Sequence, residues 1–342
     1  MNPEKTITIK EIAKSLKVSV STVSRALNDH PSISAETRKR IQKFADENNY
    51  QKNFAAIQFK TGRSLSLGVI LPEIKENFFS QAISAIEDVS LEKGYNVFFA
   101  QSHDLVHREK GLLEHFLKNR IDGLLVSLSK NTMNINHFVE FQKKGIPVVF
   151  FDRIPKEEEA YTVSCDLYAA SQNIIDFLWE RGHKDIALLK GPSSMRATKE
   201  RMRGFMEGLN KKRVKTDASL FASTDLTKES TWKAMKDILS QKRKPTAVVA
   251  FNDYVALDAI QYVRLNTDLQ INKDILFISY ANLPISQYLV EAKPIASIEQ
   301  FPYEQGKLAT KMLFDIIDGK KKLSLKERHI VLEGELKVHS KS

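Results

Sequence analysis

The sequence predicts a small all-α helix-turn-helix headpiece followed by an α/β core of two lobes, each a doubly wound parallel sheet. Two observations predict this fold. Two side-chain helix caps stand close together near the N-terminus, and from about residue 65 short apolar runs alternate with amphipathic stretches of helical period. The length of 342 residues agrees, because it exceeds what one hydrophobic core normally holds.

The composition excludes several classes of protein. With 42% hydrophobic and 27% charged residues, the chain is typical of a soluble globular protein, and no apolar run approaches the roughly 20 residues of a membrane span. The N-terminus carries Glu4 early and has no apolar signal region, so we expect no secretory signal, no membrane partner and a cytoplasmic location. The one cysteine, Cys165, excludes an internal disulfide and a multi-cysteine metal site, and we expect a reduced core residue there.

The positive charge is concentrated near the N-terminus. Residues 1–65 hold twelve Lys and Arg against six Asp and Glu, whereas the rest of the chain holds forty against thirty-six. A basic surface attracts phosphate backbones, so this segment is the candidate nucleic-acid module. The alternative is a basic face kept for solubility.

Two short helices are predicted in this segment. Thr8 and Glu11 have the spacing of a capping box, and Ser19 can cap a second helix with Thr22 three residues later. Only residues 17–18 separate the two helices, which is typical of a helix-turn-helix unit whose second helix enters the major groove. A third helix, capped by Ser34, supplies further positive charge.

The second helix has two faces. Its apolar positions Val23, Ala26 and Leu27 lie together and are expected to pack inward. The opposite face carries polar groups that suit base edges and phosphates, although an amphipathic surface helix is the alternative. The predicted DNA contacts in this segment are Thr8, Ser19, Val20, Ser21, Thr22, Ser24, Arg25 and Asn28.

The runs 8–13, 18–28 and 34–38 resemble the DNA-binding headpiece of the lactose-repressor/galactose-repressor family. This resemblance implies that Val20 and Ser21 discriminate the operator and that Arg25 contacts a base. It also implies a core like that of periplasmic binding proteins and a homodimer that reads a near-palindromic operator, because one headpiece reads only a half-site. The helix 79–92 is then the expected dimer contact.

Residues 51–65 resemble the hinge helix of that family, which enters the minor groove and wedges an apolar side chain into a base step. Asn53 and Ala56 match the pattern, and the wedge falls on Phe59. Three positions depart from it: Lys52 stands where Pro is usual, Ile57 where Arg is frequent, and Phe59 where Leu is usual. The alternative is that the apolar residues here merely cover the core.

The core shows eight short apolar runs, which predict two sets of four parallel strands and hence two similar lobes. Amphipathic stretches at 79–91, 108–119 and 201–209 are expected to be covering helices. The predicted strands are 67–71, 96–100, 123–126, 147–151, 186–189, 219–221, 247–250 and 275–278.

Ligands bind beyond the carboxyl ends of parallel strands, so two facing lobes predict a cleft there. Carboxylates, amides and Arg beside aromatic rings suit a small polyhydroxylated ligand, and the family resemblance extends over these segments. Many relatives keep a carboxylate where Ala281 stands, so the effector lacks a hydroxyl there or Asn282 compensates. The predicted effector contacts are Phe78, Phe79, Asp152, Arg153, Met195, Arg201, Leu226, Asn252, Asn282 and Gln300.

The predicted organisation is a headpiece at 1–50, a hinge at 51–65 and a core at 66–342. The first lobe is expected to hold 66–165 and 299–325, and the second 166–298 and 326–342. We expect a transcriptional repressor that responds to a sugar or sugar phosphate. The alternatives are a purine- or nucleoside-responsive regulator and an architectural DNA binder without an effector. No dinucleotide fingerprint, phosphate loop, nucleophile elbow or metalloprotease motif occurs, so we expect no enzyme, no cofactor and no metal.

Overall fold

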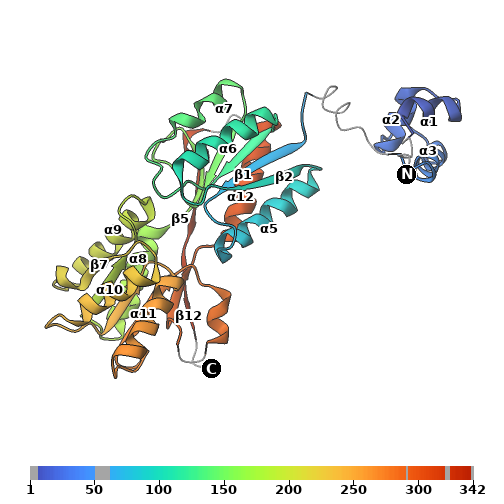
Figure 1. Ribbon diagram of the computed structural model, residues 1–342. Coiled ribbons are helices and arrows are strands. Elements are labelled where there is room, and N and C mark those ends of the chain that lie inside the picture. The colour runs from blue at the N-terminus through green and yellow to red at the C-terminus, as the bar shows by residue number, and fades with distance from the viewer. Residues whose placement is uncertain (1–6, 51–61, 290–291, 320–323, 340–342) are drawn as a thin grey trace. The chain divides into compact units, whose positions relative to one another are not determined.

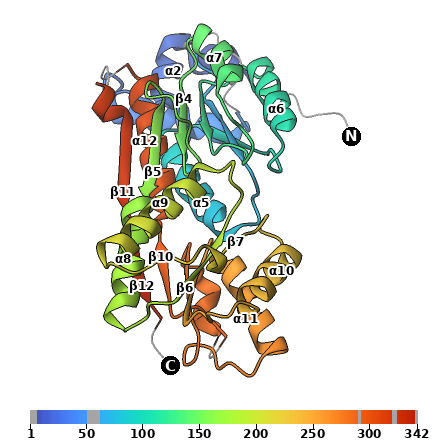
Figure 2. The ribbon, with the colours of Figure 1, turned by 90° about the vertical axis from the view of Figure 1, so that its left-hand side faces the viewer.

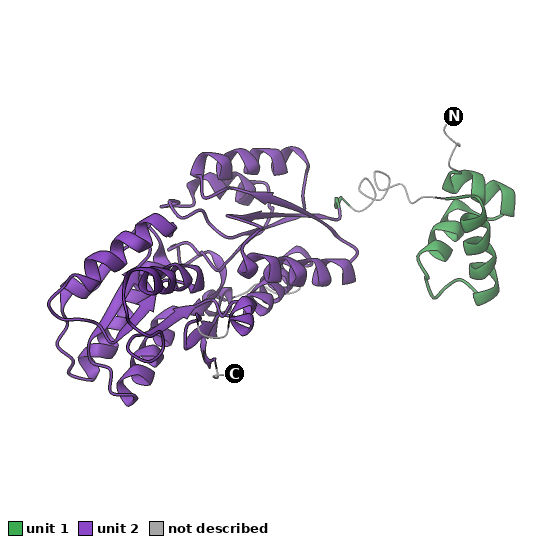
Figure 3. Cartoon of the chain, turned by 60° about the horizontal axis from the view of Figure 1, so that its bottom comes forward, with its two compact units in different colours: residues 1–64 green, residues 65–342 purple. Residues whose placement is uncertain are grey.

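The computed structural model describes residues 7–50, 62–289, 292–319 and 324–339. The chain divides into two compact units, residues 1–64 and 65–342 (Figure 3). Each unit is described by itself below.

Over residues 7–50 the first unit contains three helices, α1 (Ile9–Leu16), α2 (Val20–Leu27) and α3 (Ala35–Glu47). The predicted caps are confirmed: the hydroxyl oxygens of Thr8, Ser19 and Ser34 each accept a hydrogen bond from the backbone N–H three residues on, at 3.3, 3.0 and 3.3 Å. These caps satisfy amides that have no partner inside the helix. The helices enclose a small core of Ile12, Ala13, Val23, Ala26, Ile41 and Ala45.

The described residues of the second unit form two six-stranded sheets (Figure 1). The first has the order β11-β5-β4-β3-β1-β2 and is parallel throughout, and the second has the order β12-β10-β9-β8-β6-β7 with only β12 antiparallel. The first sheet comprises β1 (Ser66–Leu71), β2 (Asn96–Gln101), β3 (Gly123–Val126), β4 (Val148–Phe151), β5 (Tyr161–Asp166) and β11 (His329–Glu333). The second comprises β6 (Ile186–Lys190), β7 (Phe221–Ser223), β8 (Ala247–Ala250), β9 (Leu276–Tyr280), β10 (Ala296–Glu299) and β12 (Glu335–Val338).

Helices flank each sheet, and the buried apolar side chains of strands and helices form separate clusters around each one. We call the sheet containing β1, with its helices, the first lobe and the other the second lobe. The first lobe holds α5 (Asn77–Glu92), α6 (Val106–Lys118), α7 (Val139–Lys143) and α12 (Pro302–Ile317). The second holds α8 (Leu167–Glu180), α9 (Arg196–Lys211), α10 (Lys228–Leu239) and α11 (Asp253–Asn266). Short 3₁₀ helices lie at η1 (Asn136–Phe138), η2 (Ala218–Leu220), η3 (Pro284–Tyr288) and η4 (Leu325–Arg328).

The predicted fold class, an all-α headpiece with a two-lobed α/β core, is confirmed, but the strand count is wrong. Seven of the eight apolar runs correspond to strands within a residue or two. The expected strand 219–221 is mostly η2, because the Asp217 carboxylate accepts the Ser219 N–H at 2.9 Å and turns the chain before β7 begins. Strands β5 and β11 extend the first predicted set from four strands to six, and β10 and β12 do the same for the second set.

The chain crosses between the lobes three times (Figure 2). It passes from β5 to α8, returns from β10 to α12, and crosses again at Gly334, between β11 and β12. We expected residues 326–342 in the second lobe, but β11 pairs with β5 in the first, because its apolar residues extend that sheet's edge. A Cβ on Gly334 would lie 3.0–3.1 Å from side-chain atoms of Ile298, Ala170 and Cys165, so the other two crossings pack against it.

In the part of the chain that the structure describes, no helix combines the length and apolar character that a membrane crossing requires.

A glycine pair tests the helix packing of the core. A Cβ on Gly204 of α9 would stand 2.2 Å from the Tyr168 carbonyl oxygen of α8, whereas one on Gly111 of α6 would meet nothing within 4 Å. We therefore expect Gly204→Ala to lower the free energy of unfolding by roughly 2–4 kcal/mol, because the two helices must move apart. Gly111→Ala should raise it by about 0.5–1 kcal/mol through helix propensity. Urea denaturation of both variants measures these changes. Equal changes in the free energy of unfolding would contradict the close contact of α8 and α9 at Gly204.

Candidate functional site

The outer face of α2 is polar and exposed. Val20 is 43% exposed, and Ser21, Arg25 and Asn28 are also exposed, whereas Val23 is fully buried against the other helices. Among the described residues, the Arg25 guanidinium makes no hydrogen bond or ion pair, so its donors are available to a ligand. The helix therefore presents the donors and acceptors that base edges in a major groove require.

Other predicted DNA contacts have structural roles as well. The Thr8 side chain completes the capping box of α1, and the Ser19 hydroxyl lies 2.7 Å from that of Ser21 and 2.8 Å from that of Thr22. Asn28 donates its side-chain N–H to the carbonyl oxygen of Ser24 at 2.9 Å. These bonds fix the positions of the hydroxyls at the start of α2.

The predicted hinge contacts Asn53, Ala56 and Phe59 lie outside the described residues, as do the departures Lys52 and Ile57. Their roles stay predictions.

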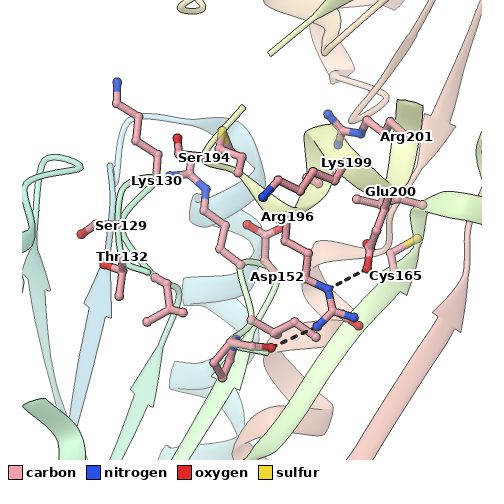
Figure 4. Close-up of a pocket in the computed structure, with 18 of the residues that line it drawn as sticks. Ser129, Lys130, Thr132, Asp152, Cys165, Ser194, Arg196, Lys199, Glu200 and Arg201 are labelled. Carbon is pink, nitrogen blue, oxygen red and sulfur yellow. Dashed lines mark hydrogen bonds and ion pairs between the residues drawn. The ribbon is translucent and has the colours of Figure 1, made fainter. Parts of the chain in front are cut away.

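A cavity of about 170 Å³ opens where the carboxyl ends of strands from both lobes meet (Figure 4). Its wall comes from the segments after β1, β3 and β4 in the first lobe and after β6, β7, β8 and β9 in the second. The passages after β5 and β10, which join the lobes, complete it. The structure brings together nine of the ten predicted effector contacts in this wall: Phe78, Phe79, Asp152, Arg153, Met195, Arg201, Leu226, Asn252 and Gln300.

Arg201 of α9 is held in place on several sides. Its guanidinium lies 4.2 Å from the ring centroids of Phe251 and Tyr280, donates to the Phe251 carbonyl oxygen at 2.6 Å, and donates to Gln300 Oε1 at 3.1 Å. Burial lowers the pKa of Arg201, an effect opposed by Tyr280 and Asp152. An arginine retains its charge even so, and its Nε, buried and without a hydrogen-bond partner in the structure, leaves one donor for a ligand.

Two carboxylates, those of Asp152 and Glu76, line the first-lobe part of the wall. Asp152 follows β4 with φ of 58°, a conformation that Asp tolerates better than most residues, and Ser127 donates its hydroxyl to Oδ2 at 3.4 Å. Burial raises the pKa of Asp152, with Arg153 and Arg201 opposing, and burial likewise raises the pKa of Glu76. Such carboxylates are strong acceptors for ligand hydroxyls.

One side chain bridges the lobes across the cavity. Arg196, in the first turn of α9, donates its Nε–H to Glu200 at 2.6 Å and its Nη1–H to the Pro155 carbonyl oxygen at 3.0 Å (Figure 4). Pro155 belongs to the segment after β4, so this hydrogen bond joins the second lobe to the first.

The sequence analysis missed the segment 128–135, which forms much of the first-lobe wall. It is held by Glu109 of α6, whose side chain is fully buried. Glu109 accepts from Ser129 N–H at 2.8 Å, Thr132 hydroxyl at 2.9 Å and His137 Nε2 at 2.7 Å. Burial alone would raise the pKa of Glu109, but these hydrogen bonds outweigh it and lower the pKa. The sequence did offer one signal for this segment: it directly follows the predicted strand 123–126, and segments after parallel strands line the predicted cleft.

Asn282 is the one predicted effector contact that the structure does not place in the cavity wall. Ala281 lines the cavity with φ of 100°, but Asn282 lies outside its wall. The amide of Asn282 donates to Glu299 at 2.8 Å and its oxygen is 3.1 Å from His339 Nε2, so both ends of the side chain are occupied. It therefore does not replace the carboxylate missing at Ala281. Asn252 does line the cavity, although its Oδ1 also accepts the Val255 N–H at 2.9 Å as the cap of α11.

Cys165 is buried, as expected, and burial raises the pKa of its thiol to about 12, so it stays protonated. It also borders the cavity. Within the described ranges, no group of three or more His, Cys, Asp or Glu side chains is arranged to hold a metal ion.

Two family models match the chain. Residues 8–53 match the model of bacterial regulatory proteins of the lacI family, and residues 67–321 match the periplasmic binding protein domain. The chain is 31% identical over 316 residues to the HTH-type transcriptional repressor CytR of Escherichia coli strain K12, covering 92% of this chain and 91% of that one. It is 29% identical over 314 residues to the repressor PurR of Pasteurella multocida, covering 92% of each.

Solved structures show the same fold. The lac repressor dimer bound to operator and the anti-inducer ONPF superposes with a TM-score of 0.81 at 23% identity, over 98% of each chain. The complex of the regulator CelR with cellobiose has a TM-score of 0.70 at 24% identity, over 97% of this chain and 98% of that one.

Proposed function

Because this chain belongs to the lacI family of bacterial regulatory proteins, we propose that it represses transcription as a homodimer on a near-palindromic operator and responds to a small polyhydroxylated effector. The chain is a DNA-binding transcriptional regulator with an effector-binding core and is not an enzyme, as its curated relatives are repressors. Repressors of this family bind DNA operators and small-molecule effectors. Its place of action would be the cytoplasm, where the DNA is.

The cavity between the lobes is the observation that carries the effector proposal. Asp152 supplies acceptors, Arg201 and Asn252 supply donors, and the rings of Phe78 and Phe79 provide an apolar surface in the same wall. Paired acceptors and donors bind the hydroxyl groups of a sugar, while aromatic rings cover its apolar faces. We therefore favour a sugar or sugar derivative as the effector.

The effector acts by favouring one arrangement of the lobes over another. Contacts from both lobes to one ligand make its affinity depend on their relative orientation, and the same dependence must appear in the affinity for DNA. The hinge segment 51–65 connects the first lobe to the headpiece, so a change at the first lobe can alter how two headpieces are spaced. The predicted hinge residues Asn53, Ala56 and Phe59 would sense that spacing in the minor groove.

The dimer contact is proposed to include α5. Leu91, at the end of this helix, is 78% exposed, and Phe98 on the edge strand β2 is also largely exposed. Exposed apolar side chains on adjacent elements are typical of a surface that a partner covers. The two-fold arrangement would place the two recognition helices about one helical turn of DNA apart.

Selection of bound duplexes from a random library, followed by calorimetry, tests the proposal. We expect enriched sequences with two-fold symmetry and two protein chains per duplex. Calorimetry of the full chain against neutral monosaccharides and disaccharides, sugar phosphates and purines should then find binding among the sugars or their derivatives. A ligand so found should change operator affinity. Binding only to purines would contradict the sugar assignment, and no preference over random DNA would contradict the function.

Replacing Asp152 by asparagine tests the role of its carboxylate. Asparagine also tolerates a positive φ, so the backbone should persist while the charged acceptor is lost. We expect about tenfold or greater loss of effector affinity, because a hydrogen bond to a charged group contributes roughly 1.5–3 kcal/mol. Asp176→Asn on the surface of α8 is the matched control and should bind as the wild type does. Full affinity in Asp152→Asn would overturn the assignment.

A further inference from the structure

The wall of the cavity carries more positive than negative side chains. The basic residues are Lys130, Arg153, Lys156, Arg196, Lys199 and Arg201, and the acidic ones are Glu76, Asp152, Glu157 and Glu200. Some of these charges already have partners: Arg153 is paired with Asp104, outside the wall, at 2.5 Å and Arg196 with Glu200 at 2.6 Å. The distribution leaves basic groups of the second lobe available to a ligand.

Arg201 is the strongest indication of a negatively charged ligand. It is only 7% exposed, and both hydrogen bonds of its guanidinium go to neutral oxygens, those of Phe251 and Gln300. Among the described residues, no carboxylate lies within ion-pair distance of it, and Nε has no hydrogen-bond partner. Asp152 attracts the guanidinium only from beyond ion-pair distance, and a buried charge without a directly paired opposite charge is costly. An anionic group in the cavity would reduce that cost.

A second set of donors lies at the N-terminus of α9. Met195 occupies the N-cap position, and no side chain caps this sixteen-residue helix, so its first amides stay available. Ser194, Arg196 and Ala197 line the cavity here. The N-terminus of a helix binds anions through these amides and through the helix dipole.

Lys199, in the next turn of α9, adds a charge to this end of the helix. In Figure 4 its side chain extends from α9 toward the middle of the labelled group, whereas Lys130 points away from that group. Its ammonium group makes no hydrogen bond or ion pair with any residue that the structure describes. Lys199 thus supplies an exposed positive charge, without a partner among the described residues, that an anionic ligand group can use.

We propose that the effector is an anionic sugar derivative, a phosphate ester or a sugar acid, whose charged group binds Ser194, Lys199 and the N-terminal amides of α9, beside Arg201. This inference rests on the proposed function and adds the charge of the ligand and its orientation. In the first-lobe wall acidic and basic side chains are equal in number, and Arg153 is already paired with Asp104. The charged end of the ligand therefore faces the more basic second lobe, and the hydroxyl end faces Asp152. A ligand bound in this way contacts both lobes.

The test compares Lys199→Gln with a matched control in the full chain. Lys233→Gln removes an exposed ammonium from α10, outside the cavity, and that group also has no partner among the described residues. The first probe is inorganic phosphate, with sodium chloride at equal ionic strength as its control. Binding of each salt is measured by calorimetry and by the shift in thermal unfolding temperature. We expect phosphate to bind wild type and Lys233→Gln alike and to bind Lys199→Gln about tenfold more weakly. The two variants also have the same net charge, so any phosphate bound elsewhere is the same in both.

The second part uses matched sugars, namely glucose, glucose 6-phosphate and glucuronate, and the corresponding forms of ribose. Tighter binding of the phosphate esters or of the acids than of the neutral sugars supports the proposal and identifies the kind of anion. Neutral sugars binding best would overturn it while leaving the proposed function intact. Equal phosphate binding by Lys199→Gln and Lys233→Gln, or no phosphate binding beyond that of chloride, would also overturn it. Operator binding without any ligand tests the proposed function separately.

Discussion

Replacement of Arg25 by alanine is expected to lower the affinity for the operator by about ten- to a hundredfold, with a much smaller change on random DNA. The side chain is exposed on α2, and its guanidinium has no partner among the described residues. Bidentate recognition of one base contributes roughly 1–3 kcal/mol of discrimination, and only the specific complex loses it. Fluorescence anisotropy with the selected operator and a scrambled duplex at fixed salt measures both affinities.

The control for Arg25→Ala is Lys43→Ala in α3. Lys43 is exposed and lies 3.7 Å from Glu47, so its removal changes the charge of the same unit without altering the outer face of α2. We expect Lys43→Ala to change both affinities equally and slightly, as loss of a long-range charge does. Equal losses on operator and scrambled DNA for Arg25→Ala would mean that this residue contacts phosphate and not a base.

Replacement of Glu109 by glutamine should have the largest effect on the stability of the first lobe. The carboxylate accepts hydrogen bonds from Ser129, Thr132 and His137, and an amide nitrogen in place of one oxygen would face a donor. Buried donors without acceptors cost about 1–3 kcal/mol each, so we expect the free energy of unfolding to fall by roughly 2–4 kcal/mol. Glu114→Gln, exposed on the same helix, should change it by less than about 0.5 kcal/mol.

The pH dependence of this effect has a definite sign. The pKa of Glu109 is lowered in the folded protein, so the unfolded chain binds a proton more readily than the folded one. The stabilisation is therefore fully present above the usual glutamate pKa and is lost as the pH falls through the lowered value. Urea denaturation at a series of pH values from 7 downward measures the free energy of unfolding of both proteins. The difference between wild type and Glu109→Gln should become smaller in acid. A gap that stays constant would contradict a charged Glu109.

Local signals explain why the headpiece could be predicted closely. Each helix there begins at a residue whose side chain caps an amide three positions on, so Thr8, Ser19 and Ser34 mark the boundaries without reference to the rest of the fold. The central strands were also predictable, because both faces of β1, β3 and β4 are buried and, apart from Ser66 at the start of β1, their sequences carry no polar side chain.

The missed strands lack that signal for physical reasons. Strands β11 and β12 lie at sheet edges and are only partly covered, so charged residues such as Glu333, Glu335 and Lys337 occur within them. In β5 the polar residues Thr162, Ser164 and Asp166 separate the apolar ones, so a search for apolar runs overlooks it. The position of Asn282 outside the cavity wall could not be predicted, because its partners Glu299 and His339 are 17 and 57 residues away in the chain.

The three passages between the lobes have a consequence for how the core withstands cleavage. With Gly334 packed against the strands of the other two passages, a protease cut in any single connection would leave two more intact. A nicked core should hence migrate as one particle under native conditions and separate into fragments only in denaturant. The same three connections hold the two walls of the cavity next to each other even when one of them is broken.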